Sequence, residues 1–394
     1  MQNVLTKSNK LLFVIGTAWL FDAMDVALLS FIMPIIGAEW KLLPTQIGYV
    51  SAVTSLGMIF GSLGCGYLAD RFGRKHVMIG TLILFSAGNL LLAFTQNVNM
   101  FMLVRFITGI GLGGELPVAA TMLADSFSGK KQSRMLVLAD SFWAIGWILA
   151  SLLSFLVMPI FGWRVTVVCT FFVSLYAFVM RRHLPDEYEN TKHERSNIFH
   201  SIKEIWSGKY LQATGVLTVL WFVVMFSYYG MFLWLPSVLI AKNIPMINSF
   251  GYTLLMSLAQ LPGYYLAAWL MGKISRKNIL VIYLLGTLIS AFIFGTANDL
   301  PIVLIGGALL SFFNLGAWGT LIAFTPSHYE AQYRGVGVGF TQSIGRIGAT
   351  LGPFLIGALL GMGLSIPMVF MMFVVVLAVG ILVLLFGIHD TVGE

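Results

Sequence analysis

Charged residues are scarce in this chain. Only 10% of its 394 residues are Asp, Glu, Lys or Arg, whereas 58% are hydrophobic. Soluble globular domains have about 25% charged residues, so this chain has too little polar material to cover a water-exposed surface. The scarcity excludes a soluble protein and indicates one that faces lipid.

Cysteine is rare too, and the chemistry of most enzymes is missing. Cys65 and Cys169 both lie in apolar segments, so no disulfide framework is expected. The six histidines fall in predicted loops or at the C-terminus, which argues against a histidine proton relay within the membrane. No metal-ligand cluster, nucleophile elbow or phosphate-binding glycine loop is recognisable. We therefore expect no enzyme, no metal and no cofactor.

Long apolar runs are what the chain does have, and a bilayer-spanning helix needs about 20 mainly apolar residues. The first run contains Asp22 and Asp25 and lacks a small-residue cleavage site, so it is a span and not a signal peptide. We predict an all-α integral membrane protein with twelve transmembrane helices. They lie near residues 11–37, 46–69, 76–95, 99–123, 135–158, 163–181, 211–240, 249–272, 277–296, 300–324, 336–361 and 366–388.

The net charge of +7 is explained by membrane topology. With twelve spans and both termini in the cytoplasm, most of the 23 Lys and Arg residues fall in cytoplasmic segments, as the positive-inside rule requires. The basic surplus therefore predicts a lipid bilayer as partner, and no nucleic acid.

A polar interval divides the chain into two halves. We predict an N-terminal six-helix half at 1–181, a cytoplasmic linker at 182–209 and a C-terminal six-helix half at 210–394. Residues 198–206 place Ile and Trp on one helical face and predict a short interfacial helix within the linker. Residues 68–75 are echoed at 270–277, which indicates pseudo-symmetric halves with a binding site between them near the middle of the membrane.

The stretch from Gly66 to Lys75, Gly-Tyr-Leu-Ala-Asp-Arg-Phe-Gly-Arg-Lys, matches the loop signature of the major facilitator superfamily. A carboxylate there can pair with a helix N-terminus or an arginine, and a glycine permits a tight turn. We expect this loop to latch one transport state; a basic loop that serves only orientation is the rival interpretation. Its proposed gating residues are Asp70, Arg71, Gly73, Arg74 and Lys75.

Charges inside the spans are few, and a charge in hydrocarbon usually marks a pathway or a pair. Asp22 and Asp25 share one face of the first span, and counting 1.5 Å per residue places Asp25 level with Arg105 of the fourth. A carboxylate beside an arginine can exchange a proton when a conformational change alters their separation. A permanent structural ion pair is the alternative. The candidate coupling residues are Asp22, Asp25, Arg105, Glu115 and Asp140.

Arg346 lies about ten residues into the eleventh span, near mid-membrane. It requires an anion, and the guanidinium suits a carboxylate. A substrate carboxylate and a fixed carboxylate of the other half remain equally possible partners.

Aromatic residues with polar tips gather in the spans expected to face the central cavity. Rings provide stacking area, while Tyr, Trp and Asn supply orienting hydrogen bonds, so the group suits a flat aromatic ligand. Trp234 of the seventh span belongs to this group as well, and an interfacial belt is the rival interpretation for Trp221 and Trp234. The candidate substrate residues are Trp143, Tyr228, Tyr229, Asn314 and Trp318, together with Arg346.

Five strings together resemble those of bacterial nicotinate transporters, over residues 11–388. They are Trp19 to Asp25, Gly109 to Pro117, Asp140 to Trp147, Phe226 to Pro236 and Ser311 to Gly319. The resemblance implies niacin uptake across the bacterial cytoplasmic membrane. Two wider resemblances add to it.

The spacing of Asp22 and Asp25 is similar to a first-span motif of aromatic-acid/proton symporters. Trp143, Tyr228 and Tyr229 resemble ligand-pocket positions of synaptic vesicle glycoproteins. These likenesses raise the three aromatic residues above the others as candidates.

We therefore expect a monomeric, proton-linked importer of nicotinate that works by alternating access. The alternatives are a proton symporter of another small aromatic carboxylate and a non-transporting receptor of the same fold. Radiolabelled substrate accumulation in proteoliposomes distinguishes them.

Overall fold

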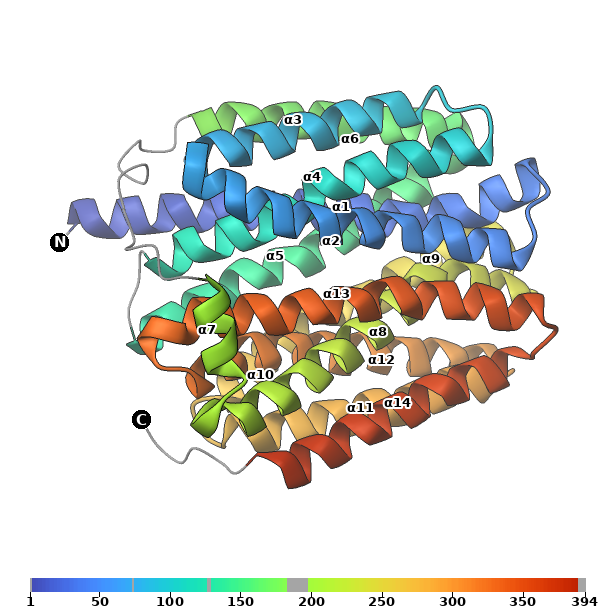
Figure 1. Ribbon diagram of the computed structural model, residues 1–394. Helices are drawn as coiled ribbons and strands as arrows, with labels where there is room; N and C mark the ends of the chain where they lie inside the picture. Colours follow the sequence, from blue (N-terminus) through green and yellow to red (C-terminus); the bar gives the residue numbers. More distant parts are fainter. Residues whose placement is uncertain (1, 73, 126–128, 183–197, 389–394) are drawn as a thin grey trace. The chain divides into compact units, whose positions relative to one another are not determined.

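The computed structural model is helical throughout its regular secondary structure in the part of the chain that it describes (Figure 1). The backbone is described for residues 2–72, 74–125, 129–182 and 198–388. Side chains in these ranges are described except at 2–11, 63, 66, 67, 69–71, 74, 75, 116–125, 129–134, 136, 172–182, 198, 199 and 331.

Contacts within the chain define two compact units. The first consists of Met1–Thr191 and Phe232–Leu254, and the second of Lys192–Met231 and Leu255–Glu394. The domain boundaries predicted at residues 182 and 209 stay a prediction.

Twelve membrane-spanning segments account for nearly all of the described chain. The helices that form them are α1 (Gln2–Glu39), α2 (Pro44–Phe72), α3 (Arg74–Leu92), α4 (Val98–Asp125), α5 (Gly129–Leu156), α6 (Met158–Arg182), α8 (Leu211–Ala241), α9 (Met246–Leu258), α10 (Gln260–Leu270), α11 (Arg276–Thr296), α12 (Leu300–Phe324), α13 (Ala331–Gly361) and α14 (Ile366–Gly387). Seven segments are long and apolar enough to cross a bilayer when the described residues are searched. Five more, made by α2, α3, α4, α6 and the pair α9 and α10, bring the number to the predicted twelve.

The short helix predicted between the halves is present as α7 (Ile198–Ile205). A 3₁₀ turn at Gly208–Tyr210 leads from it into α8. Within the second unit α7 packs against α13.

The eighth span, predicted near residues 249–272, is formed by two helices. It is broken at Ala259 into α9 and α10. Pro262 explains the break, because it has no N–H to donate to the carbonyl of Leu258 and its ring clashes with that carbonyl. Ala259 itself keeps helical dihedral angles, φ −68° and ψ −13°, so the break is a local change of hydrogen bonding and not an unwound segment.

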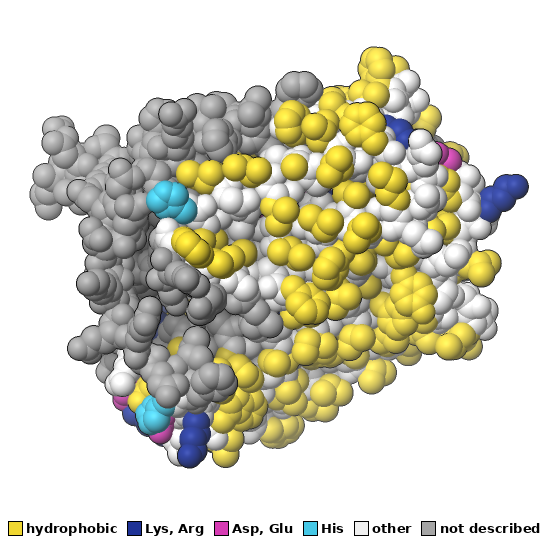
Figure 2. Space-filling model, turned by 45° about the horizontal axis from the view of Figure 1, so that its top comes forward, with side chains coloured by type: hydrophobic (Ala, Val, Ile, Leu, Met, Phe, Trp, Pro, Cys, Tyr) yellow, Lys and Arg dark blue, Asp and Glu magenta, His cyan; other side chains and the backbone are white. Residues whose placement is uncertain are grey.

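Apolar side chains cover much of the face seen in Figure 2, as expected of a surface in contact with lipid. Among the most exposed are Phe386 at 80%, Ile160 at 73% and Leu103 at 60% relative accessibility. Large apolar side chains this exposed mark a membrane or protein contact, and they occur on helices along the whole chain. The apolar character of the exposed side chains therefore agrees with the prediction of a protein that faces lipid.

In the first unit, glycines let α2 and α4 pack backbone to backbone. An added Cβ on Gly57 would lie 2.2 Å from the carbonyl oxygen of Phe106, and one on Gly109 would lie 2.2 Å from that of Thr54. Small residues allow such close approach in membranes. This packing holds Thr54 and Arg105 at adjacent positions across the two helices.

Candidate coupling and substrate sites

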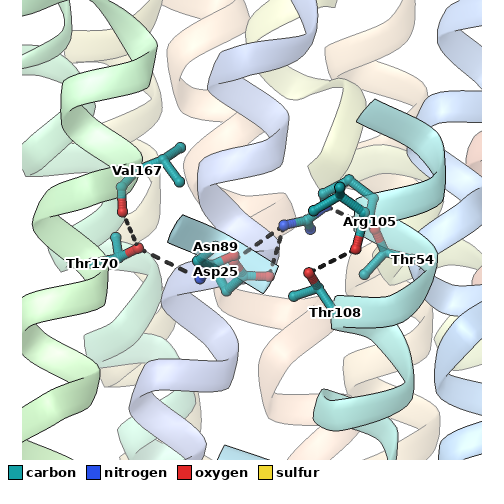
Figure 3. A network of polar contacts seen from close by, with 8 residues as sticks. Asp25, Thr54, Asn89, Arg105, Thr108, Val167 and Thr170 are labelled. Atoms are coloured by element: carbon teal, nitrogen blue, oxygen red, sulfur yellow. Dashed lines mark hydrogen bonds and ion pairs between the residues drawn. The ribbon is translucent and has the colours of Figure 1, made fainter. Parts of the chain in front are cut away.

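A buried ion pair joins α1 and α4 in the first unit (Figure 3). Arg105 Nη1 donates to both carboxylate oxygens of Asp25, at 3.1 and 2.9 Å. Arg105 Nε donates to Thr54 Oγ1 at 3.0 Å, so α2 also takes part. The exposed fractions are 3% for Asp25 and 1% for Arg105. The pair predicted from depth along the helices is thus formed, while its coupling role stays a prediction.

Polar side chains of α3, α4 and α6 make hydrogen bonds in the same unit. Asn89 on α3 donates through Nδ2 to Thr170 Oγ1 at 3.5 Å, and Thr170 donates to the carbonyl of Val167 at 2.6 Å. Thr108 donates to the carbonyl of Val104, one turn earlier on α4. Figure 3 shows these side chains around Asp25 and Arg105. A buried charge pair has a large mutual attraction only because water is excluded, and losing one partner leaves a costly isolated charge.

The other candidate coupling carboxylates are buried as well. Asp22 lies one turn before Asp25 and is 1% exposed, Glu115 on α4 is 1% exposed, and Asp140 on α5 is 4% exposed. The carboxylate that contacts Arg105 in an ion pair is that of Asp25. The proposed part of Asp22, Glu115 and Asp140 in proton movement stays a prediction.

Three aromatic rings of the predicted substrate site meet in the second unit. The centroids of Tyr228 and Tyr229 lie 5.2 Å apart and their planes are nearly perpendicular, at 89°. The Trp318 ring on α12 lies 5.2 Å from Tyr228 and 6.4 Å from Tyr229. All three side chains are buried. These separations fall in the range of favourable aromatic contacts. We call Tyr228, Tyr229, Trp318 and the neighbouring Trp221 the aromatic cluster.

Trp221, for which an interfacial belt is the rival interpretation, is buried within the second unit. It is 1% exposed, its ring centroid lies 5.7 Å from that of Trp318, and its Nε1 donates to Thr325 Oγ1 at 2.9 Å. Trp234, a member of the predicted aromatic group, is 3% exposed. Since α8 is apolar on every side, its sequence gives no periodicity that would identify the buried face.

The polar members of the predicted substrate site lie in the same unit. Asn314, one turn before Trp318 on α12, donates through Nδ2 to Ser227 Oγ at 3.2 Å, and its Oδ1 is buried without a hydrogen bond. Ser227 directly precedes Tyr228, so this bond connects the amide to the aromatic cluster. Arg346 on α13 is 7% exposed. A buried guanidinium at this depth is suited to an anion.

Trp143, the remaining candidate for the substrate site, belongs to the first unit. It lies on α5 and is 3% exposed. One turn later, Trp147 packs edge to face against Phe232 with centroids 5.7 Å apart. The part of Trp143 in ligand binding stays a prediction.

The predicted gating loop is short, since α2 ends at Phe72 and α3 begins at Arg74. Gly73 lies outside the described residues, as do the side chains of Asp70, Arg71, Arg74 and Lys75. The latch that these residues are expected to form stays a prediction.

Comparison with known proteins decides the family. Residues 15–256 and 247–393 match the family described as the Major Facilitator Superfamily. The chain belongs to this superfamily. A solved structure titled as that of a D-xylose-proton symporter superposes on it with a TM-score of 0.80, covering 98% of this chain and 99% of the other. At 17% identity, that likeness shows the twelve-helix major facilitator fold alone.

Two relatives in the superfamily are similar to this chain over almost its full length. The putative niacin/nicotinamide transporter NiaP of Bacillus subtilis is 47% identical over 95% of this chain and 94% of its own. The niacin transporter NiaP of Acinetobacter baylyi is 36% identical over 98% of this chain and 94% of its own. A gallate transporter of Pseudomonas putida is 26% identical over 89% of this chain and 85% of its own.

Thr54 and Ser227 were missed among the candidate residues, although each binds a predicted one. Ser and Thr are common in the spans, and many of their hydroxyls donate a hydrogen bond to a backbone carbonyl of their own helix, as those of Ser30 and Thr287 do. The sequence therefore does not distinguish the few hydroxyls that bind a side chain of another helix.

Proposed function

We propose that this major facilitator protein imports nicotinate across the cytoplasmic membrane of a bacterium, by alternating access and with proton coupling. In this proposal both termini lie in the cytoplasm, as the distribution of Lys and Arg indicates. The observation that carries it is the 47% identity, over 95% of the chain, to a relative named as a niacin/nicotinamide transporter. The second relative named for niacin supports the same substrate.

The chemistry of the second unit supports a flat anionic ligand. Nicotinate is an aromatic ring with one carboxylate, and the aromatic cluster offers ring faces and edges on α8 and α12. Arg346 supplies the positive charge, and Asn314 adds an amide that already has one partner in Ser227. We propose that the rings hold the pyridine and that Arg346 and Asn314 hold the carboxylate, with Trp143 contributing a further ring.

The ion pair of Asp25 and Arg105 supports a route for protons. Protonation of Asp25 neutralises it and weakens its attraction to Arg105, while the hydrogen bond from Arg105 to Thr54 is unaffected. We propose that this change alters the packing of α1 against α4 and so the balance between the two transport states. Asp22, Glu115 and Asp140 are further proposed proton acceptors.

A second substrate class has support among the relatives. Proteins named as gallate and 4-hydroxybenzoate transporters match 89% and 87% of this chain at 26% identity. An aromatic cluster with one arginine suits these carboxylates as well, so another small aromatic acid is the alternative substrate.

Transport by purified protein in liposomes tests the proposal. With acid outside and neutral buffer inside, we expect radiolabelled nicotinate to accumulate above its outside concentration and to collapse to equilibrium when a protonophore is added. Accumulation of benzoate or gallate in preference to nicotinate would favour the alternative. Binding of nicotinate without uptake or exchange would instead indicate a receptor.

A further inference from the structure

A buried polar side chain without a hydrogen-bond partner lies at the break between α9 and α10. Gln260 is the first residue of α10, directly after the break at Ala259. It is 0% exposed, and neither its Nε2 nor its Oε1 makes a hydrogen bond. A buried amide without hydrogen bonds is costly, so such a group in a folded protein calls for a specific partner.

Contacts with α12 define where Gln260 lies. An added Cβ on Gly307 would lie 2.4 Å from Met256 Sδ, and one on Gly263 would lie 2.2 Å from the carbonyl of Phe312. The order of these contacts shows that the eighth span and α12 run in the same direction. Gln260 lies between them in sequence, and it shares the buried stripe of α10 that carries Gly263 and Tyr264. Its level on α12 is therefore between Gly307 and Phe312.

A second unpartnered group lies in that interval. Ser311 is 1% exposed, and its Oγ makes no hydrogen bond, unlike most buried hydroxyls of the described spans. Three residues later, Asn314 Oδ1 is also without a hydrogen bond. Ser311, Asn314 and Trp318 are spaced by three and four residues, so they follow one face of α12. The unpartnered groups thus continue toward the aromatic cluster.

Resting on the proposed function, we infer that Gln260, assisted by Ser311, is a specificity-determining residue that donates a hydrogen bond to the ring nitrogen of a pyridine carboxylate. Nicotinate has two polar ends, the carboxylate and the ring nitrogen. The carboxylate is an anion and is best held by the charge of Arg346. The ring nitrogen accepts one hydrogen bond, and the Gln260 amide and the Ser311 hydroxyl are neutral donors.

The inference makes a definite statement about selectivity. Benzoate has the shape and charge of nicotinate but places a C–H where the nitrogen lies, so it leaves Gln260 unpartnered. Isonicotinate and picolinate keep the ring and carboxylate and move the nitrogen. A site that hydrogen-bonds a substrate atom rejects analogues that lack it, because its own buried polar group then stays unpaired.

The test measures binding of nicotinate, benzoate and isonicotinate to purified protein by titration. Wild type should prefer nicotinate to both analogues. Gln260→Met keeps the length of the side chain and removes the amide; it should weaken nicotinate by roughly two- to tenfold, the range for one neutral hydrogen bond, and leave benzoate almost unchanged. Ser311→Ala should give a smaller loss in the same direction.

Thr287→Val is the matched control, since its hydroxyl is satisfied by the carbonyl of Tyr283 on its own helix. It should leave the ratio of nicotinate to benzoate affinity unchanged. Equal weakening of both ligands by Gln260→Met, or an unchanged ratio, would overturn the inference and assign Gln260 a packing role.

The comparison of nicotinate, benzoate and isonicotinate on wild-type protein tests the inference even if the variants fail to fold. Wild type that binds nicotinate and benzoate equally would also overturn the inference while leaving aromatic-acid transport intact. Absence of nicotinate binding by well-folded wild type would instead refute the proposed function itself.

Discussion

At the scale of single residues, the buried charges decide most of the chemistry open to this protein. Asp25 and Arg105 neutralise one another, and both are almost fully enclosed by α1, α2 and α4. Replacing a buried pair of this kind by apolar residues is often neutral or stabilising, so stability alone does not account for it. A permanent structural ion pair and a proton-coupling pair would have the same geometry. The two roles differ in how the loss of the pair affects proton-driven transport.

Asp25→Asn separates these two roles. We expect loss of uphill nicotinate accumulation driven by a proton gradient, with exchange of internal for external substrate retained, because Asn cannot bind and release a proton. Removing one member of a buried pair costs about 3–5 kcal/mol when the other charge is left unpaired, so thermal stability is measured alongside and the double variant Asp25→Asn/Arg105→Gln is included.

Glu39→Gln is the control for Asp25→Asn. Glu39 also accepts hydrogen bonds from an arginine, Arg164, but both side chains are well exposed, at 38% and 40%. We expect full accumulation and a stability change of about 0.2–1 kcal/mol, as for other surface pairs. Full pH-driven accumulation by Asp25→Asn and by Asp22→Asn would rule out coupling through either residue.

Arg346 and Trp318 divide the recognition of charge from the recognition of the ring. A hydrogen bond to a charged group contributes about 1.5–3 kcal/mol, so Arg346→Gln should weaken nicotinate by about ten- to a hundredfold and nicotinamide far less. Trp318→Ala removes a ring that contacts Tyr228 and should weaken both ligands by similar factors. Titration calorimetry of each variant with each ligand gives the four affinities. An unchanged preference for acid over amide in Arg346→Gln would identify Arg346 as the partner of a fixed carboxylate.

At the scale of helices, close backbone packing sets how well the site is held. The α2 and α4 pair meets through four glycines, and in each case the atom that an added Cβ would approach most closely is a backbone carbonyl oxygen. These glycines are Gly57, Gly61, Gly109 and Gly113. A carbonyl in a helix cannot move aside as the end of a flexible side chain can, so this packing tolerates no added methyl group. It also carries Thr54 and Arg105, which ties the geometry of the ion pair to the contact between helices.

Gly57→Ala tests this packing. The new Cβ would lie 2.2 Å from the carbonyl of Phe106, so the helices must separate. Overpacking of this kind costs about 1–3 kcal/mol, and we expect a lower melting temperature in detergent and weaker transport. Gly64→Ala is the matched control on the same helix, since nothing lies within 4 Å of its added Cβ. Equal melting temperatures for the two variants would contradict the packing argument.

Contacts between helices could be predicted from the sequence where a span carries a rare residue type, and could not be predicted where many positions of a span have similar side chains. The depth of each residue along its span was enough to pair Asp25 with Arg105, because few charged residues lie within the spans. The twelve-span fold and the superfamily were predicted correctly from apolar runs and the loop signature.

The partners of Trp221 could not be predicted because α8 is apolar all round, and the break before Gln260 could not be predicted because a proline inside a span often only kinks it. Orphaned amides such as that of Gln260 depend on neighbours far away in the chain, so no local pattern reveals them. The assignments of individual site residues stay predictions.

At the scale of the whole molecule, transport requires two states of similar free energy that expose the site to opposite sides in turn. A contact formed in only one state shifts the balance between them by the free energy of that contact. The loop between α2 and α3 is the proposed place of such a contact, and its counterpart at 270–277 has Gly272 where the first has Asp70. The two loops are therefore expected to differ in how strongly they bias the states.

Asp70→Ala tests this bias. The carboxylate is expected to stabilise one transport state through a helix N-terminus or an arginine, so its loss should slow uptake while equilibrium binding of nicotinate changes little. Charges at helix termini contribute about 0.3–1 kcal/mol at exposed sites and up to ~2 kcal/mol in partly buried geometry, which limits the shift between states to about thirtyfold. Uptake rates in proteoliposomes and binding titrations on the same preparation give the two quantities.

Asp299→Ala is the control, since Asp299 is a loop carboxylate directly before α12 whose side chain does not cap that helix. It should alter neither quantity. An uptake rate for Asp70→Ala equal to that of wild type would show that the loop serves membrane orientation alone, and a parallel loss of binding would place Asp70 in the fold of the site instead of in the balance between states.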